Sequence, residues 1–165
     1  MTHIDLEAPA RKFCAAHSLT FAKQVGEGSF KETFQVFARD GTDAALKIYK
    51  PGSSHKRNRR EVDAMRRCSH PNIARLLDIQ TYDYRGQKYV VVLEEFLAGG
   101  TLTAKGVIAA SECFRIGKEL IDAIAHIAER RLVHRDIKPD NILFRAGGVV
   151  PVLTDFGVAR DLADS

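Results

Sequence analysis

The chain has 165 residues, of which 45% are hydrophobic and 28% are charged, and its formal net charge is +4. A chain of this size can bury a sizeable core in one or two compact units. The net charge is too small to imply nucleic acid as a partner. No uncharged apolar stretch reaches the roughly 18 residues that a membrane-spanning helix needs. The polar start of the chain does not resemble a signal peptide, so we expect a soluble protein that does not bind a membrane.

The N-terminal half is predicted to contain mainly strands. Residues 1–18 are expected to be an extension that Pro9 interrupts, with a short helix over Ala10–His17. Apolar and polar residues then alternate as in half-buried strands, and Asp40-Gly41 and Arg85-Gly86 are turn signals. The predicted strands are Leu19–Val25, Phe34–Ala38, Ala44–Tyr49, Ile73–Thr81 and Lys88–Leu93, with a helix inserted over Asn58–Cys68.

The C-terminal half begins with Ala98-Gly99-Gly100, whose glycines suggest a linker. Its best helix is expected to run from Ser111, a candidate N-cap, to Arg130. The apolar side of this helix would consist of Phe114, Ile116, Leu120, Ile121, Ile124 and Ile127. Three short strand-like segments follow at Leu132-Val133, Ile142–Phe144 and Val150–Leu153.

This order of elements predicts an α+β fold, with an antiparallel sheet and one helix before the glycine break and a helical part after it. We assign residues 1–18 to an N-terminal extension, residues 19–96 to a sheet-containing lobe and residues 97–165 to a second lobe. Two such lobes are expected to meet at a cleft, where ligands commonly bind.

Positive charge is concentrated between Lys47 and Arg75, where nine Lys or Arg accompany only two acids. Such a run can form a patch for nucleic acid or another acidic partner. The alternative is a solvated loop that leads into a helix, which is the commoner role of charge runs. We favour the loop and do not expect nucleic acid to bind.

The three cysteines, Cys14, Cys68 and Cys113, lie far apart in the sequence. They lack the paired spacing of a zinc site or a disulfide framework and favour a reducing compartment. The sequence therefore predicts a cytoplasmic protein.

The stretch from His134 to Asn141 places an acid, a base and an amide in one loop. Asp136 can accept a proton from a hydroxyl group, Lys138 can neutralise a phosphate, and Asn141 can hold a metal ion. Asp155, the first residue of an Asp-Phe-Gly run, offers a second carboxylate to the same metal. Each side chain alone could be a loop cap or turn residue. Together, however, a proton acceptor, a cation and two metal ligands at this spacing point to phosphoryl transfer.

Two features of the strand region fit the same chemistry. Gly26 and Gly28 lie in a turn, where backbone N–H groups can approach phosphate oxygens, although two glycines also suit a plain hairpin. Lys47 lies on a predicted buried strand and needs a partner there, because an unpaired buried charge is costly. Glu61 on the following helix is the natural partner, and the alternative is a surface lysine.

In this order the motifs resemble those of the eukaryotic-like serine/threonine protein kinases. The catalytic loop is His-Arg-Asp-Ile-Lys-Pro-Asp-Asn over 134–141, the metal motif is Asp-Phe-Gly over 155–157, and the lysine strand is Ala-Ala-Leu-Lys over 44–47. The Lys138-Pro139 pair within this loop resembles the loop sequence of serine/threonine kinases rather than that of tyrosine kinases. The resemblance covers about Leu19 to Asp164.

The resemblance implies a protein-kinase-like fold, with a small antiparallel-sheet N-lobe, one key helix and a partial helical C-lobe. It implies ATP and Mg²⁺ as cofactors, Asp136 and Lys138 as catalytic residues, and Asn141 and Asp155 as metal ligands.

The nucleotide-binding residues implied by the resemblance come mostly from the predicted sheet. They are Gly26, Gly28, Val25, Thr33, Ala45, Lys47, Glu61, Glu95 and Leu143. Among them, Ala45 and Leu143 would sandwich the adenine ring. Glu94 stands beside the adenine at a position that is usually apolar or small in the family.

The chain departs from the family pattern at the phosphate loop and at its end. Lys31 replaces the third glycine of the loop, and Thr33 replaces the following valine. The chain ends at Ser165, before the segments that bind the protein substrate in the family. We therefore expect an incomplete domain whose exposed lobe associates with itself or with a partner chain.

The predicted function is ATP-dependent phosphorylation of Ser or Thr hydroxyls on proteins, with very weak or no phosphorylation by these 165 residues alone. The alternative is a short non-catalytic ATP-binding module that regulates, or is completed by, a partner chain. A small-molecule kinase of related fold is disfavoured by His134-Arg135-Asp136 and by Lys138-Pro139.

Overall fold

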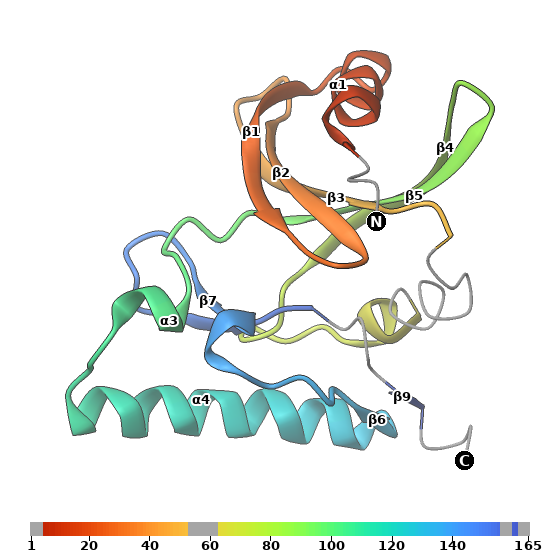
Figure 1. The fold of residues 1–165 in the computed structure, drawn as a ribbon. Helices are drawn as coiled ribbons and strands as arrows, with labels where there is room; N and C mark the ends of the chain where they lie inside the picture. Colours follow the sequence, from red (N-terminus) through yellow and green to blue (C-terminus); the bar gives the residue numbers. More distant parts are fainter. Residues whose placement is uncertain (1–4, 53–62, 156–159, 162–165) are drawn as a thin grey trace. The chain divides into compact units, whose positions relative to one another are not determined.

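The computed structural model describes residues 5–52, 63–155 and 160–161 (Figure 1). By their internal contacts the residues divide into two compact units. The first unit comprises Met1–Asn58 and Leu76–Phe96, and the second comprises Arg59–Arg75 and Leu97–Ser165. In the part of the chain that is described, no helix is long and apolar enough to cross a membrane.

The first unit is built on a five-stranded antiparallel sheet in the order β1-β2-β3-β5-β4. The strands are β1 (Thr20–Glu27), β2 (Lys31–Phe37), β3 (Asp43–Tyr49), β4 (Leu76–Tyr84) and β5 (Gln87–Glu95). All five predicted strands are present, with ends shifted by a few residues. The predicted turns join β2 to β3 and β4 to β5, and Gly41 and Gly86 adopt positive φ angles of 83° and 78° there. Glycine enters this region of backbone space at no steric cost.

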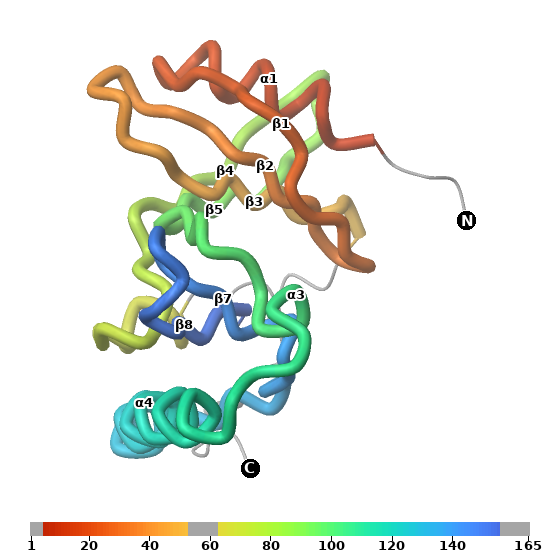
Figure 2. The backbone as a smooth tube through the Cα atoms, turned by 90° about the vertical axis from the view of Figure 1, so that its left-hand side faces the viewer, coloured from red at the N-terminus to blue at the C-terminus, as the bar shows by residue number. Residues whose placement is uncertain are grey.

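Helix α1 (Glu7–Ala16) lies over one face of this sheet (Figures 1 and 2). Leu6, Ala10, Phe13 and Cys14 recur at helical spacing and are at most 1% exposed. They share one core with the sheet residues Phe34, Val36, Ala44, Leu46, Ile48 and Val91. The predicted short helix is confirmed, but Pro9 does not interrupt it, because a proline is tolerated in the first helical turn.

The second unit contains the long helix α4 (Ala110–Glu129), the short helix α3 (Leu102–Lys105) and a hairpin of β7 (Ile142–Phe144) and β8 (Pro151–Leu153). A second small sheet pairs β6 (Leu132–Val133) with β9 (Arg160–Asp161). Residues 63–67 are helical. Of the predicted helix over Asn58–Cys68, residues 58–62 lie outside the described residues and Cys68 is not helical. Four of the nine basic residues between Lys47 and Arg75 also lie outside them, namely Lys56, Arg57, Arg59 and Arg60.

Helix α4 differs from its prediction in two respects. Its N-cap is Ala109 rather than Ser111, with extended backbone (φ −64°, ψ 149°) and no side-chain cap among the described residues. Its apolar residues also divide between two faces. The buried face consists of Ile116, Leu120, Ala123 and Ile127, whereas Phe114, Ile121 and Ile124 are 81%, 65% and 38% exposed. The single apolar side was wrong because residues three, four or seven apart share a helix face, so Phe114 and Ile121 point away from the face of Ile116 and Leu120, and Ile124 lies at its edge.

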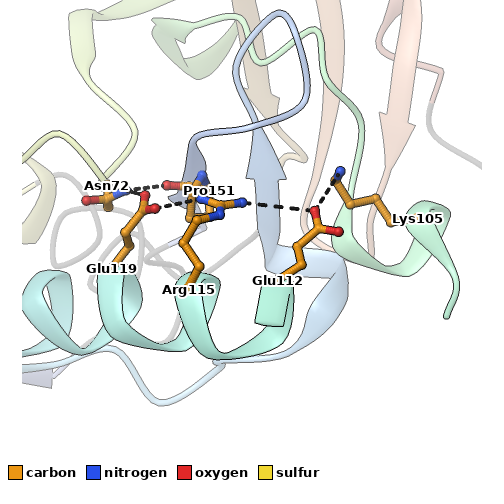
Figure 3. A network of polar contacts seen from close by, with 6 residues as sticks. All are labelled: Asn72, Lys105, Glu112, Arg115, Glu119 and Pro151. Carbon is orange, nitrogen blue, oxygen red and sulfur yellow. Dashed lines mark hydrogen bonds and ion pairs between the residues drawn. The ribbon is translucent and has the colours of Figure 1, made fainter. Parts of the chain in front are cut away.

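A polar network joins α4 to the segment before β4 and to β8 (Figure 3). Its members are Asn72, Lys105, Glu112, Arg115, Glu119 and Pro151. The buried amide of Asn72 donates to Glu119 Oε2 at 3.0 Å and to the Pro151 carbonyl oxygen at 2.7 Å. Arg115 in turn pairs with Glu119 at 2.6 Å and with Glu112 at 4.0 Å. The network therefore anchors β8, the strand that leads into Asp155.

The predicted linker at 98–100 packs closely against β7. The Gly99 N–H donates to the Phe144 carbonyl oxygen at 2.8 Å, and the Phe144 N–H donates to Gly100 at 2.9 Å. A Cβ atom on Gly99 would lie only 2.4 Å from the Arg145 carbonyl oxygen. Glycine is required here because no side chain fits into this backbone contact.

Candidate active site

Residues 134–141 form the loop between β6 and β7 in the second unit. The loop ends in a short 3-10 turn, η1 (Pro139–Asn141), in which the Asn141 N–H donates to the Lys138 carbonyl oxygen at 2.9 Å. Proline suits the first position of such a turn because its N–H would have no partner there. Arg135 adopts a positive φ of 71°. Non-glycine residues in this conformation are uncommon and tend to cluster at functional sites.

Asp136 is the centre of the polar contacts in this loop. Lys138 Nζ lies 2.9 Å from Asp136 Oδ2, and Asn141 Nδ2 donates to the same oxygen at 2.8 Å. The hydrogen bond from Lys138, aided by that from Asn141, lowers the pKa of Asp136 below its ordinary value. The same contact with Asp136 raises the pKa of Lys138. Asp136 is therefore an ionised proton acceptor beside a permanent positive charge.

His134 holds the start of the loop against the end of β8. Its ring is 3% exposed, and its Nε2 lies 3.1 Å from the Thr154 carbonyl oxygen. The Asp136 N–H approaches His134 Nδ1 at 3.3 Å. Nδ1 must then be the acceptor, so the proton of a neutral ring belongs on Nε2, where it can be donated to Thr154. The histidine thus links the backbone of Asp136 to the residue before Asp155.

Asp155 is the second residue after β8 and lies near the loop. The Thr154 N–H donates to the Asn141 carbonyl oxygen at 3.0 Å. The negative charge of Asp155 acts on both members of the neighbouring pair: it partly opposes the lowering of the Asp136 pKa by Lys138, and it adds to the raising of the Lys138 pKa by Asp136. Asp155 also has a positive φ of 69°. The second unit therefore brings together the four residues predicted for catalysis and metal binding, and Asp155 itself and Arg135 beside them have positive φ angles.

The oxygen atoms in this group suit Mg²⁺. The side chain of Asn141 is buried, and its Nδ2 donates to the backbone and the carboxylate of Asp136. Its amide oxygen is then the atom suited to a metal. Asp155 adds a half-buried carboxylate. Carboxylate and amide oxygens are ligands that Mg²⁺ accepts together with phosphate oxygens.

In the first unit, several predicted nucleotide-binding residues share one face of the sheet. Thr33 pairs with both Gly26 and Lys47, and Ala45 pairs with Glu94. Paired residues in an antiparallel sheet point to the same face, as do residues two apart on a strand. Gly26, Thr33, Ala45 and Lys47 therefore lie on the face opposite to α1.

Other predicted nucleotide-binding residues are placed differently. Val25 lies at an irregularity of β1 and is 42% exposed. Glu95 pairs with Ala44, so its side chain belongs to the α1 face and only its backbone could serve a nucleotide. Leu143 lies on β7 in the second unit, and its predicted contact with adenine opposite Ala45 stays a prediction. Glu61 lies outside the described residues, and its pairing with Lys47 also stays a prediction.

The turn between β1 and β2 is tight. The Gly28 N–H donates to the Lys31 carbonyl oxygen at 2.9 Å, and a Cβ on Gly28 would lie 3.3 Å from that oxygen. Lys31, which replaces the third glycine of the family pattern, places its Nζ 5.3 Å from the centroid of the Tyr49 ring. Such a position allows a cation–π contact.

Lys47 makes a buried ion pair that the sequence did not predict. Its Nζ lies 2.7 Å from Glu94 Oε2, and the two side chains are 8% and 3% exposed. The signal that could have revealed this pair was a glutamate at the end of the apolar run Val90–Leu93 on the neighbouring strand. A buried carboxylate of that kind needs a cation.

Comparison with known proteins identifies the family. The protein kinase domain matches residues 19–165. The chain belongs to the protein kinase domain family. The resemblance and the α+β fold class predicted from the sequence are thereby confirmed.

The relatives of this kinase chain come from animals, plants and bacteria. Serine/threonine-protein kinase 36 of Pongo abelii is 34% identical over 149 residues, which cover 86% of this chain and 11% of that protein. CBL-interacting serine/threonine-protein kinase 24 of Arabidopsis thaliana is 34% identical, with 83% and 32% covered. Serine/threonine-protein kinase PrkC of Bacillus subtilis is 38% identical over 114 residues, with 67% and 17% covered. The chain thus spans a third or less of the length of these curated relatives.

Proposed function

We propose that this chain carries the nucleotide-binding and catalytic-loop part of a protein kinase that phosphorylates Ser and Thr hydroxyls with ATP. The observation that carries the proposal is the Asp136 carboxylate, in contact with Lys138 at 2.9 Å and Asn141 at 2.8 Å. Relatives named as serine/threonine-protein kinases support the choice of hydroxyl substrates.

The proposed reaction moves the γ-phosphoryl group from ATP to the hydroxyl oxygen of a protein. The new bond forms between that oxygen and the γ-phosphorus, the bond to the β-phosphate oxygen breaks, and ADP leaves. Asp136 orients the hydroxyl and takes its proton, which its ionised state allows. Lys138 carries the positive charge that offsets the charge on the phosphoryl oxygens.

The remaining site residues hold the nucleotide. Lys47 would bind the α- and β-phosphates, and the backbone between Gly26 and Gly28 would approach the phosphate oxygens. Mg²⁺, which neutralises phosphate charge when bound, would be held by Asn141 and Asp155.

Titration of the chain with ATP, with and without Mg²⁺, tests this proposal. We expect saturable, magnesium-dependent binding that Asp155→Ala weakens about tenfold or more. Asp140→Asn is the matched control, since Asp140 is an exposed carboxylate of the same loop that accepts a hydrogen bond from Thr103 at 2.7 Å. Binding that is absent, or indifferent to both Mg²⁺ and Asp155→Ala, would show that the site is wrongly assigned.

The exposed face of α4 favours a second candidate, an ATP-binding module that is completed by association. Phe114 and Ile121 are 81% and 65% exposed on this helix. Exposed apolar patches often mark protein contacts, and the occupant we propose is a second copy of the chain.

Light scattering tests this association. The measured mass should rise with protein concentration, and the mass of the Ile121→Glu variant should be lower at the same concentration. The control is Val149→Glu, which changes an apolar side chain that is 60% exposed outside α4. A monomer at all concentrations would rule out self-association.

We also infer a cytoplasmic location. The support is the spacing of Cys14, Cys68 and Cys113, which fits a reducing compartment. Cell fractionation with a soluble marker enzyme tests this location, and recovery with membranes or in the medium would contradict it.

A further inference from the structure

Glu94 and Lys47 are neighbours because of the register of the central strands. On β3 and β5, Lys47 pairs with Val92 and Ala45 pairs with Glu94. Glu94 is therefore the diagonal neighbour of Lys47 on the same face of the sheet, within reach of a long side chain. Strand pairing sets the 2.7 Å contact between Lys47 Nζ and Glu94 Oε2.

The surroundings make this contact strong. Glu94 and Lys47 are 2% and 6% exposed as whole residues, so water screens their attraction little. A carboxylate restricts the side chain of a buried lysine to one position. If the carboxylate is removed, the lysine side chain must move to reach another hydrogen-bond acceptor. Lys47 also keeps donors for other groups, because an ammonium has three N–H bonds and Glu94 Oε2 takes one.

We propose that Glu94 is a positioning residue, which holds the ammonium of Lys47 in place for the phosphates of the nucleotide. This rests on the proposed function, in which Lys47 binds the α- and β-phosphates. The carboxylate comes from the sheet itself, on the strand next to Lys47. The lysine is therefore oriented by the register of β3 and β5, whichever other contacts it makes.

Two substitutions at Glu94 separate positioning from simple filling of space. Glu94→Gln keeps the volume and an oxygen that can accept the lysine N–H. Glu94→Leu keeps approximate volume and removes the acceptor. We expect the dissociation constant for ATP to stay within about threefold in Glu94→Gln and to rise about tenfold in Glu94→Leu, the size expected for losing a hydrogen bond to a charged group. Glu7→Gln, which removes one exposed carboxylate of α1 in the same unit, is the charge-matched control.

Two comparisons show whether Glu94 acts through Lys47. In a Lys47→Met background, Glu94→Leu should change ATP affinity no further, because the residue it positions is gone. Adenosine, which has no phosphates, should bind the unsubstituted chain and both Glu94 variants alike. Isothermal titration calorimetry with ATP and adenosine, at fixed Mg²⁺, measures all of these constants.

The outcomes separate this proposal from the function on which it rests. An equal effect of Glu94→Leu in both lysine backgrounds, or an equal effect on adenosine, overturns the positioning role but leaves ATP binding intact. An unchanged ATP affinity in Glu94→Leu does the same. Failure of the unsubstituted chain to bind ATP overturns the proposed function and this proposal together. If Glu94→Leu does not fold, Glu94→Met, which also lacks an acceptor, takes its place: a tenfold loss of ATP affinity that disappears in the Lys47→Met background supports positioning, and an unchanged affinity overturns it.

Discussion

In the sheet of the first unit, the side chains of Lys47 and Glu94 are 8% and 3% exposed and lie 2.7 Å apart. In the loop of the second unit, Lys138 and Asp136 are 48% and 38% exposed and lie 2.9 Å apart. The two contacts are almost equally short, but only one is shielded from water. Breaking the buried pair leaves a charge without solvent, whereas water replaces the partner in the exposed pair. The first pair should therefore affect stability, and the second should affect mainly chemistry.

The largest expected effect is on catalysis by the exposed pair. In a kinase assay on a Ser-containing peptide, run with the family's substrate-binding segments fused to the chain, Asp136→Asn should lower kcat by about 10²- to 10⁴-fold, since an amide cannot accept the hydroxyl proton. Its free energy of unfolding should change little, because the carboxylate is 38% exposed. Asp140→Asn in the same loop serves as the control. Activity that survives in Asp136→Asn would remove Asp136 from the catalytic role.

The next effect compares the two lysines by stability. Lys47→Met should lower the free energy of unfolding by about 3–5 kcal/mol, because Glu94 is then left buried without the Lys47 cation. Lys138→Met should cost at most about 1 kcal/mol, because its partner is solvated. Urea denaturation measures both. The double variant Lys47→Met/Glu94→Leu should recover much of the loss, and equal losses for the two lysines would break the comparison between the units.

These two pairs also show how far sequence reasoning reaches. The loop from His134 to Asn141 was predictable because its roles are carried by residues close in sequence, so one motif fixes their contacts. The contact between Lys47 and Glu94 depends on the register of β3 against β5. These strands are far apart in the sequence, and the residues of one strand alone do not predict which residues of the other they will face. A motif within one segment therefore predicted which residues lie together, whereas a contact between segments was missed.

The fold shows the same division. Turns such as Asp40-Gly41 were predicted because glycine supplies a conformation that other residues resist. The start of α4 was misplaced because Ser111 is a good N-cap by type, but the chain turns into the helix at Ala109. Glu32 was not singled out, although it alternates with Phe34 and Val36 on the buried face of β2. A polar residue within such an alternation is a signal for a buried charge.

A third prediction tests whether α1 belongs to the sheet of the first unit. Phe13 is fully buried in the same core as Phe34 and Leu46. Phe13→Ala should lower the free energy of unfolding by about 3 kcal/mol, through lost burial and the cavity left behind. Phe114→Ala on the exposed face of α4 is the matched control and should cost less than about 0.5 kcal/mol. Similar values for the two would mean that α1 adds no core to the sheet.

A fourth prediction concerns the other buried carboxylate of the first unit. Burial raises the pKa of Glu32, while the Leu6 N–H and Lys50 lower it and Glu27 and Asp5 raise it further. The folded chain therefore binds this proton more tightly than the unfolded chain. The resulting stabilisation is full below the ordinary glutamate pKa and is lost as the pH rises through the raised value.

The variant Glu32→Gln removes this titration. The free energy of unfolding of the unsubstituted chain, minus that of Glu32→Gln, should increase as the pH falls from 7 to about 4. Denaturation at several pH values measures this difference. A difference that decreases with falling pH would mean that the fold stabilises the ionised form of Glu32. Glu32 would then resemble Glu94, whose carboxylate pairs with a lysine.

The smallest expected effect uses the cysteines to follow the units separately. Cys14 of α1 and Cys68 of the second unit are both buried, whereas Cys113 on α4 is exposed. Burial raises the pKa of Cys14 to about 11 and also raises that of Cys68. The thiolate is the reactive form, so at pH 8 a thiol of that pKa is ionised to only about one part in a thousand. Iodoacetamide should therefore modify Cys113 first.

Modification of the two buried thiols then reports local opening. Cys14 can react only when α1 leaves the sheet, and Phe13→Ala removes much of the contact that holds it there. This substitution should speed the labelling of Cys14, read site by site by mass spectrometry, and should leave Cys68 unchanged because Cys68 belongs to the other unit. Equal acceleration of labelling at Cys14 and Cys68 would show that the two units open together. The two units would then differ in the exposure of their ion pairs but not in their stability.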